Sequence, residues 1–170
     1  MEVKIYPDSI LKEKAENVEE INDNIIKILN EMKETMYRYN GIGLAAEQVG
    51  ILQKLVVIDT KIGDESKLIE LINPEIIASE GTYDEHDEGC LSIPEYYGVV
   101  KNRKKYVKVK YLDKNGNEQT IETDEFLSVV LQHEIDHLNG IVFIDRMSRI
   151  RRTLFKKQWK KIKTKEAAKQ

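Results

Sequence analysis

The stretch His133-Glu134-Ile135-Asp136-His137 decides the fold of this chain, because a central helix has to carry it. On a helix, residues four positions apart are turned from each other by about 40° and lie roughly 6 Å apart along the axis. Both imidazoles can therefore reach one metal ion, and Glu134 is close enough to take a proton from a metal-bound water. This spacing is typical of a hydrolytic metal site. The alternative is a surface helix that carries two histidines by chance.

The sequence around this motif predicts a long and largely buried helix. Residues 124–132 lead into it without Gly or Pro. We expect Thr123 or Asp124 to be the N-cap and Asn139-Gly140 to end the helix. The apolar residues that share a helical face with the two histidines are Phe126, Val129 and Val130. The metal-facing side of the helix is therefore mostly apolar, and we expect the site to be buried.

Composition indicates one domain with its own core. The chain has 170 residues, of which 41% are hydrophobic. A single cysteine excludes an internal disulfide and is typical of a reducing compartment. No apolar run approaches the roughly 20 residues of a membrane span, and the first residues lack the apolar segment of a secretory signal. We therefore expect a cytoplasmic protein that does not bind a membrane, and we expect it to be a monomer.

The C-terminal segment has a charge opposite to that of the rest of the chain. Residues 147–170 contain three Arg and seven Lys against one Glu, whereas residues 1–146 contain 17 basic and 29 acidic residues. Its apolar residues at helical spacing are Ile150, Leu154, Phe155, Trp159 and Ile162. We expect residues 1–147 to form one catalytic domain and residues 148–170 an amphipathic helix, as part of that domain or as an appended arm. The apolar stripe formed by these residues can pack on the body. The lysines of the segment are then either merely solvated or in contact with a polyanion such as ribosomal RNA.

The remaining periodicity predicts an α+β fold. A first helix is expected from Asn22 to Tyr39, where apolar residues repeat at helical spacing and Asn40-Gly41 can end the helix. Strands are expected at 54–58, 68–72, 76–83, 105–112 and 118–123, with breaks at 63–64 and 73–74 and a hairpin turn at 113–117. This order favours mostly antiparallel sheets packed around a central metal-binding helix, with a long N-terminal helix and a C-terminal helix.

Two further segments have the composition of a functional site. Residues 41–48, Gly-Ile-Gly-Leu-Ala-Ala-Glu-Gln, have little side-chain bulk, and Gln48 adds an amide that can donate hydrogen bonds. The alternative is a tightly packed turn. Cys90 lies in the polar segment 88–94, a poor place for an inert core cysteine, and is the best candidate for a third metal ligand. His86 is the competing ligand.

Together, the segments Gly41-Ile42-Gly43-Leu44-Ala45-Ala46-Glu47-Gln48, Glu88-Gly89-Cys90-Leu91-Ser92 and Gln132-His133-Glu134-Ile135-Asp136-His137 resemble the three motifs of bacterial peptide deformylases. Each motif is matched, in the same order, and the length agrees over the whole chain. Phe143-Ile144-Asp145-Arg146 is also similar to that family. The family removes the formyl group from the formylmethionine that begins new polypeptides. The resemblance therefore implies formyl-methionyl nascent polypeptides as the substrate.

The resemblance also implies a role for each candidate residue. The implied ligands of one metal ion per chain are Cys90, His133 and His137. The metal is usually Fe²⁺ in this family, and Zn²⁺, Ni²⁺ or Co²⁺ can replace it. Glu134 is the implied general acid/base, and Gln48 with the backbone N–H of Leu91 would face the formyl oxygen. A contact between Arg103 and Asp136 is suggested as well.

These residues are consistent with one reaction sequence. A metal-bound water would add to the formyl carbon after Glu134 accepts its proton, and Glu134 would then protonate the departing amine. Phe126, Val129 and Val130 are placed to line an apolar pocket for the methionine side chain. The open backbone around Ile42-Gly43 can pair with the substrate as an added strand.

Two other functions share parts of this pattern. A zinc endopeptidase would explain residues 133–137 but would leave Cys90 and the glycine-rich segment without a role. A non-enzymatic, metal-bound protein that contacts the ribosome would explain the basic C-terminal segment.

Overall fold

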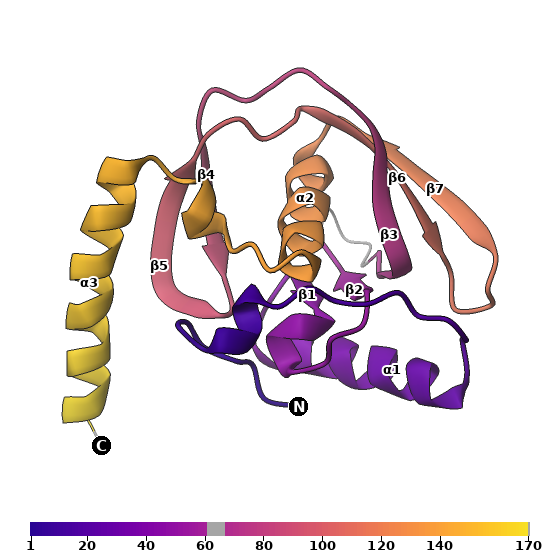
Figure 1. Cartoon of the computed structure of the whole chain (residues 1–170), viewed down its shortest axis with the longest axis horizontal. Coiled ribbons are helices and arrows are strands. Elements are labelled where there is room, and N and C mark those ends of the chain that lie inside the picture. Colours follow the sequence, from indigo (N-terminus) through magenta and orange to yellow (C-terminus); the bar gives the residue numbers. More distant parts are fainter. Residues whose placement is uncertain (61–66, 170) are drawn as a thin grey trace.

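The computed structural model describes residues 1–60 and 67–169 (Figure 1). Its helices are α1 (Asp23–Arg38), α2 (Phe126–Leu138) and α3 (Arg149–Ala168), with the short 3-10 helices η1 (Ser9–Lys12), η2 (Ala46–Val49) and η3 (Phe143–Arg146). Its strands are β1 (Gly43–Ala45), β2 (Leu55–Ile58), β3 (Ile69–Glu80), β4 (His86–Cys90), β5 (Ile93–Val100), β6 (Tyr106–Leu112) and β7 (Glu118–Thr123).

The strands form two separate antiparallel sheets. The larger has the order β1-β2-β3-β6-β7, and the smaller is the β4-β5 hairpin. Helix α2 lies between the large sheet and the hairpin (Figure 1). The predicted α+β fold, with antiparallel sheets around a central helix that carries both histidines, is therefore confirmed.

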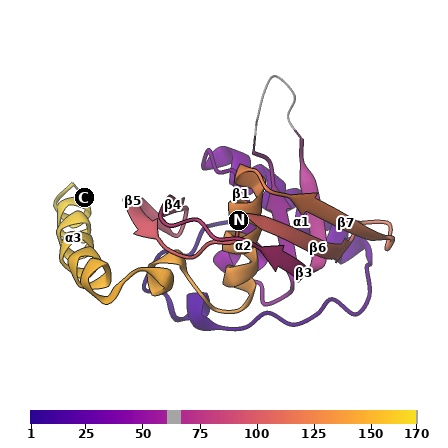
Figure 2. The same cartoon turned by 90° about the horizontal axis from the view of Figure 1, so that it is seen from above.

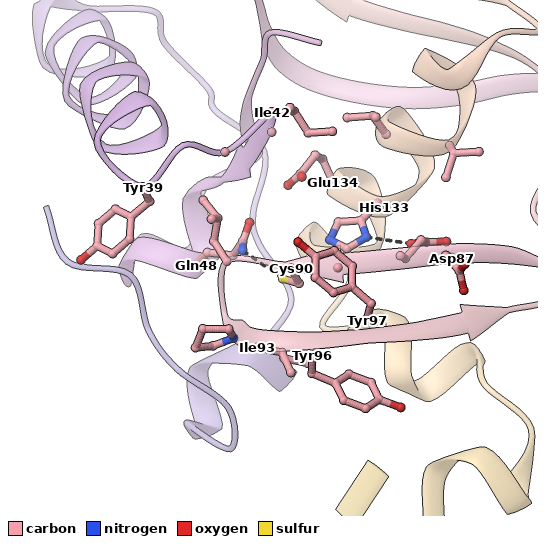
Figure 3. Close-up of a pocket in the computed structure, with 18 of the residues that line it drawn as sticks. Tyr39, Ile42, Gln48, Asp87, Cys90, Ile93, Tyr96, Tyr97, His133 and Glu134 are labelled. Atoms are coloured by element: carbon pink, nitrogen blue, oxygen red, sulfur yellow. Dashed lines mark hydrogen bonds and ion pairs between the residues drawn. The ribbon is translucent and has the colours of Figure 1, made fainter. Parts of the chain in front are cut away.

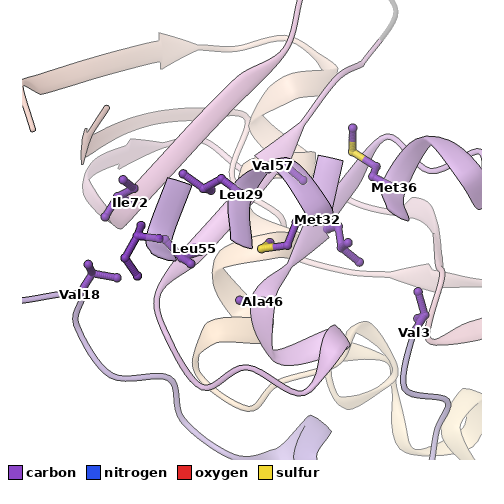
Figure 4. Close-up of a cluster of buried hydrophobic side chains, with 11 residues drawn as sticks. Val3, Val18, Leu29, Met32, Met36, Ala46, Leu55, Val57 and Ile72 are labelled. Carbon is purple, nitrogen blue, oxygen red and sulfur yellow. The ribbon is translucent and has the colours of Figure 1, made fainter. Parts of the chain in front are cut away.

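Strand β2 joins the layers because both of its faces are buried. Leu55 and Val57 belong to a cluster that includes the buried face of α1 (Figure 4). Val56 and Ile58 belong to a second cluster, which includes Val130 of α2. Successive side chains of a strand point to opposite faces, so four apolar residues in a row can contact both helices. The histidine-bearing helix is thus fixed against the centre of the sheet.

The predicted ends of α1 and the predicted C-terminal end of α2 are confirmed. The Asn22 side chain accepts a hydrogen bond from the N–H of Ile25 at the start of α1. Asn40, just past the C-terminal end, has a φ of 54°. Helix α2 ends at Asn139 and Gly140, whose φ of 70° is readily adopted by glycine.

The predicted N-cap of α2 was wrong. The residue at that position is Glu125, whose side chain makes no capping hydrogen bond. Thr123 is the last residue of β7 and pairs with Val107, so the chain needs two more residues before it can turn into the helix. The Thr123 hydroxyl instead accepts a hydrogen bond from the N–H of Glu125.

One prediction about the strands was wrong, and one hairpin was missed. Residues 69–80 form one strand, β3, because the register with β6 shifts between Ile72 and Glu75 and thereby accommodates Asn73-Pro74 inside the strand. The β4-β5 hairpin was not predicted, since residues 86–90 are mostly polar and lack an alternating pattern. The predicted break at 63–64 lies outside the described residues.

Helix α3 packs on the hairpin side of the molecule, away from the large sheet (Figure 2). Phe155 and Trp159 are buried in a third cluster, which includes Phe143 of η3. Ile150 and Leu154 of the predicted stripe stay 75% and 54% exposed. Within residues 1–60 and 67–169, none of the helices has the length and apolar character that crossing a membrane requires.

Candidate active site

Both motif histidines meet the single cysteine where α2 faces the β4-β5 hairpin. His133 and His137 lie one turn apart on α2, and Cys90 is the last residue of β4. One ligand atom from each residue lies within 4.8 Å of the other two, and Cys90 Sγ is 3.2 Å from His137 Nε2. The fold therefore brings Cys90 to the helical pair, and His86 is not part of this group.

Each of these histidines is held by a buried carboxylate. His133 Nδ1 lies 2.8 Å from Glu88 Oε1, and His137 Nδ1 lies 3.1 Å from Glu47 Oε2. A carboxylate partner favours a proton on Nδ1 and leaves Nε2 free to bind a metal ion. One thiol sulfur and two imidazole nitrogens suit divalent zinc, iron, cobalt or nickel. The donor set therefore fits a metal cofactor.

The electrostatics of the cluster favour a thiolate. Burial raises the pKa of Cys90, but His137 and His133 outweigh burial and lower it to about 5. Burial lowers the pKa of His133, but hydrogen bonds with Cys90 and Glu88 raise it to about 9. The thiolate and the imidazoles thus stabilise one another's charges, and a divalent cation can replace the imidazole protons.

Glu134 extends from α2 toward the glycine-rich segment (Figure 3). Its side chain is buried, and Oε2 has no hydrogen-bond partner within residues 1–60 and 67–169. Burial raises the pKa of Glu134 to about 7, against the attraction of His133 and His137. A Cβ on Gly43 would lie only 2.5 Å from Glu134 Oε1, so a side chain at that position would displace the carboxylate. The absence of bulk in the segment 41–48 therefore makes room for this acid.

Gln48 lies in η2 and faces the cysteine (Figure 3). Its Oε1 accepts a hydrogen bond from the N–H of Ala45 at 3.0 Å. Its Nε2 donates to Ser92 Oγ at 3.1 Å and lies 3.4 Å from Cys90 Sγ. The amide is thus oriented with its N–H groups toward the cluster. Leu91 follows Cys90 directly and contributes to the same cavity.

A cavity of about 570 Å³ opens beside this cluster. The substrate-binding residues predicted from the sequence all line it: Ile42, Gly43, Phe126, Val129 and Val130. His86 also lines it, with its ring 6.2 Å from the Phe126 ring. Tyr39 and Tyr97, which had no predicted role, are exposed residues of the same cavity. The wall is mostly apolar, which suits an apolar side chain.

Sequence reasoning missed the residues that support the site. Glu47 lies inside the segment 41–48, and Glu88 and Ser92 lie inside the segment 88–92, but no role was predicted for their side chains. Their position close to Gln48 and Cys90 in the chain was the signal that could have identified them as part of the site. The suggested contact is present, because Arg103 Nη1 donates to Asp136 Oδ2 at 2.6 Å.

Comparisons with known proteins agree with this geometry. The family described as "Polypeptide deformylase" matches residues 1–153. A curated peptide deformylase from Thermodesulfovibrio yellowstonii is 52% identical over 161 residues, which cover 94% of this chain and 96% of that protein. One from Syntrophobacter fumaroxidans is 48% identical over 168 residues, covering 98% and 97%.

Solved structures show the same fold. A peptide deformylase from Legionella pneumophila has a TM-score of 0.90 and 39% identity, covering 98% of this chain and 96% of its own. A peptide deformylase from Synechococcus elongatus, solved in complex with actinonin, has a TM-score of 0.83 and 40% identity, covering 88% and 81%. These comparisons favour a deformylase over the zinc endopeptidase and the non-enzymatic protein. The chain belongs to the polypeptide deformylase family, the metal-dependent hydrolases that remove the formyl group from the N-terminal formylmethionine of new polypeptides.

Proposed function

We propose that Cys90, His133 and His137 hold the catalytic metal ion of this deformylase. The observation that carries the proposal is the convergence of one thiol and two imidazoles, each imidazole oriented by a buried carboxylate. Three protein ligands leave a further position open, as in catalytic rather than structural sites. A metal bound here would act as a Lewis acid toward a water molecule and the formyl carbonyl.

The proposed native metal is Fe²⁺, one ion per chain, with Zn²⁺, Ni²⁺ or Co²⁺ as possible substitutes. The resemblance to the family supports Fe²⁺, and a mixed sulfur and nitrogen donor set is compatible with all four ions. Metal analysis of protein purified without oxygen tests this proposal. Iron at close to one equivalent is expected, and zinc as the main metal under those conditions would contradict it.

Glu134 is the proposed general acid/base. Its carboxylate would accept a proton from the attacking water and return it to the amine that leaves as the C–N bond breaks. Two observations support this role: Oε2 has no partner among the described residues, and burial raises the pKa of Glu134 to about 7. A group that accepts and returns a proton works best when its pKa lies near the ambient pH.

Gln48 and the backbone N–H of Leu91 are the proposed donors to the formyl oxygen, on which negative charge grows as water adds. The orientation of the amide supports this, since Oε1 is bound to Ala45 and Nε2 faces Cys90. Loss of one such donor typically costs on the order of 10²–10³ in rate.

The proposed binding mode combines one pocket with backbone pairing. Phe126, Val129 and Val130 would surround the methionine side chain, as their place in the cavity supports. The substrate backbone would add as a strand beside β1 near Ile42 and Gly43, because β1 pairs with β2 alone among the described strands and lies at the edge of the sheet. Such pairing depends little on side chains and so suits an enzyme with many polypeptide substrates.

Helix α3 is the proposed contact with the ribosome. Its buried residues Phe155 and Trp159 fix it to the body, while Lys157, Lys161 and Lys165 remain exposed. A positively charged surface of this kind favours phosphate-rich RNA. We propose that α3 is an integral helix of the one catalytic domain and that the protein is a monomer. We also propose that it is cytoplasmic, since a reducing compartment preserves a free thiol ligand.

Formate release from formyl-Met-Ala-Ser tests the catalytic roles. The wild type, loaded with Fe²⁺ without oxygen, is expected to release formate and to leave the unformylated peptide intact. Glu134→Gln should retain the metal and lose at least about 10²-fold in rate, whereas the exposed control Glu118→Gln should be unchanged. Cys90→Ser should lose metal affinity.

Two results would contradict these assignments. Full formate release by Glu134→Gln would remove this residue from the acid/base role. Undiminished metal binding by Cys90→Ser would show that another group completes the coordination sphere.

A further inference from the structure

We propose that Arg146 is a positioning residue for the metal ligand His133, acting through Asp136, Arg103 and Glu88. These side chains form a continuous series of charge-assisted hydrogen bonds from η3, near the surface, to the imidazole. The inference rests on the proposed function, in which His133 binds the metal.

The inner part of this series determines the orientation of Glu88. Arg103 Nε donates to Glu88 Oε2 at 2.7 Å, and Arg103 Nη2 donates to Oε1 at 2.8 Å. The same Oε1 lies 2.8 Å from His133 Nδ1. A two-point contact between a guanidinium and a carboxylate fixes the plane of the carboxylate. The direction in which Glu88 holds the imidazole therefore depends on where Arg103 lies.

The outer part determines where Arg103 lies. Its third contact is with Asp136 Oδ2, at 2.6 Å. Arg146 also binds Asp136 at two points, with Nη2 2.7 Å from Oδ1 and Nε on Oδ2. Asp136 Oδ2 is thus shared by both arginines. Without Arg146, Oδ1 of Asp136 would have no donor from the part of the chain that the structure describes, and the carboxylate could rotate. The Arg103 guanidinium that binds Oδ2 would then shift with it.

Exposure distinguishes the two arginines. The Arg103 side chain is 3% exposed, so its removal would leave the buried carboxylate of Glu88 without its cation. The Arg146 side chain is 42% exposed, and an ion pair at that exposure contributes little to stability. Replacing Arg146 therefore alters the geometry of the series while leaving most of the folding free energy intact.

The test uses Co²⁺ as the metal probe, bound to the full chain without oxygen. Cobalt on a thiolate has charge-transfer and ligand-field absorption bands that report ligand geometry. Arg146→Met removes the fork but keeps an apolar stem, and Arg146→Lys keeps the charge with one point of contact. Lys12→Met is the matched control, because Lys12 forms an ion pair with Asp145, the residue next to Arg146 in η3.

Arg146→Met is expected to lose cobalt to a chelator about 10–100 times faster than the wild type, with shifted ligand-field bands. Arg146→Lys should lie between the two, and Lys12→Met should match the wild type in both readouts. If Arg146→Met does not fold, Arg146→Lys carries the same comparison, and a rate and spectrum equal to those of the wild type overturn the inference.

A purely structural role of Arg146 predicts a different result. The thermal midpoint of Arg146→Met would then fall, while its cobalt spectrum and rate of cobalt loss would stay those of the wild type. That result would overturn the role of Arg146 but not the proposed metal site. Failure of the proposed metal site looks different again. In that case the wild type itself would lack the thiolate charge-transfer band, or Cys90→Ser would retain it.

Discussion

Replacing Gly43 by alanine tests how closely the glycine-rich segment surrounds the acid/base. The added Cβ would lie 2.5 Å from Glu134 Oε1, whereas ordinary contact begins at 3.4 Å, so the carboxylate must move by about 0.9 Å. A displacement of about 1 Å in a catalytic group can cost about 10²-fold in rate, or about 2.7 kcal/mol. Gly43 does not have a positive φ, so alanine introduces no backbone strain.

We therefore expect Gly43→Ala to lower kcat for formyl-Met-Ala-Ser about 10²-fold, with the metal content and the thermal midpoint close to those of the wild type. The formate assay should be repeated in the Glu134→Gln background. If the glycine acts through Glu134, its replacement there should cost only a few-fold, because neighbouring residues that act as a unit are not additive. An equal 10²-fold loss in both backgrounds would refute this reasoning, as would full activity of Gly43→Ala.

Three further predictions concern the pocket and α3. Val130→Gln places an amide without a hydrogen-bond partner in an apolar wall, so KM for formyl-Met-Ala-Ser should rise about 10-fold or more in steady-state assays. An unchanged KM would argue against the pocket assignment. Joint replacement of Lys157, Lys161 and Lys165 by Gln should reduce the salt dependence of ribosome binding by roughly two to three in log–log slope, without altering peptide turnover; equal binding at low salt would contradict an electrostatic contact. Trp159→Ala removes a side chain that is 6% exposed and should destabilise the protein by about 3–5 kcal/mol in denaturant unfolding, and a loss below about 1 kcal/mol would show that α3 is not firmly packed.

The helix with the two histidines could be predicted because its pattern is local. A spacing of four residues gives nearly the same direction on any α-helix, so the chain around His133 and His137 already determines that both can bind one ion. The C-terminal ends of α1 and α2 could be predicted for the same reason, since Asn40 and Gly140 tolerate positive φ where a helix ends. Most strands of the five-stranded sheet could be predicted from runs of β-branched residues. The break predicted at Asn73-Pro74 was wrong, because a register shift accommodates these residues within β3.

The hairpin that carries Cys90 was not predictable from local pattern. Its first strand is polar, and the buried Glu88 is held by Arg103 and His133. Such a burial depends on partners 15 and 45 residues away in the chain. No periodicity reports contacts of that range.

By itself, the sequence determined the helical histidine pair, the free thiol as its best partner, and the small residues beside them. Tertiary structure alone decided that Glu47, 90 residues before His137, holds that imidazole. It also placed the Glu134 carboxylate where a side chain on residue 43 would lie. It also decided that Arg146 is linked through Asp136 to the other histidine. The physical reason is range: helical spacing is fixed by backbone hydrogen bonds over four residues, whereas the direction of a buried side chain is fixed by whichever charges the folded layers bring against it.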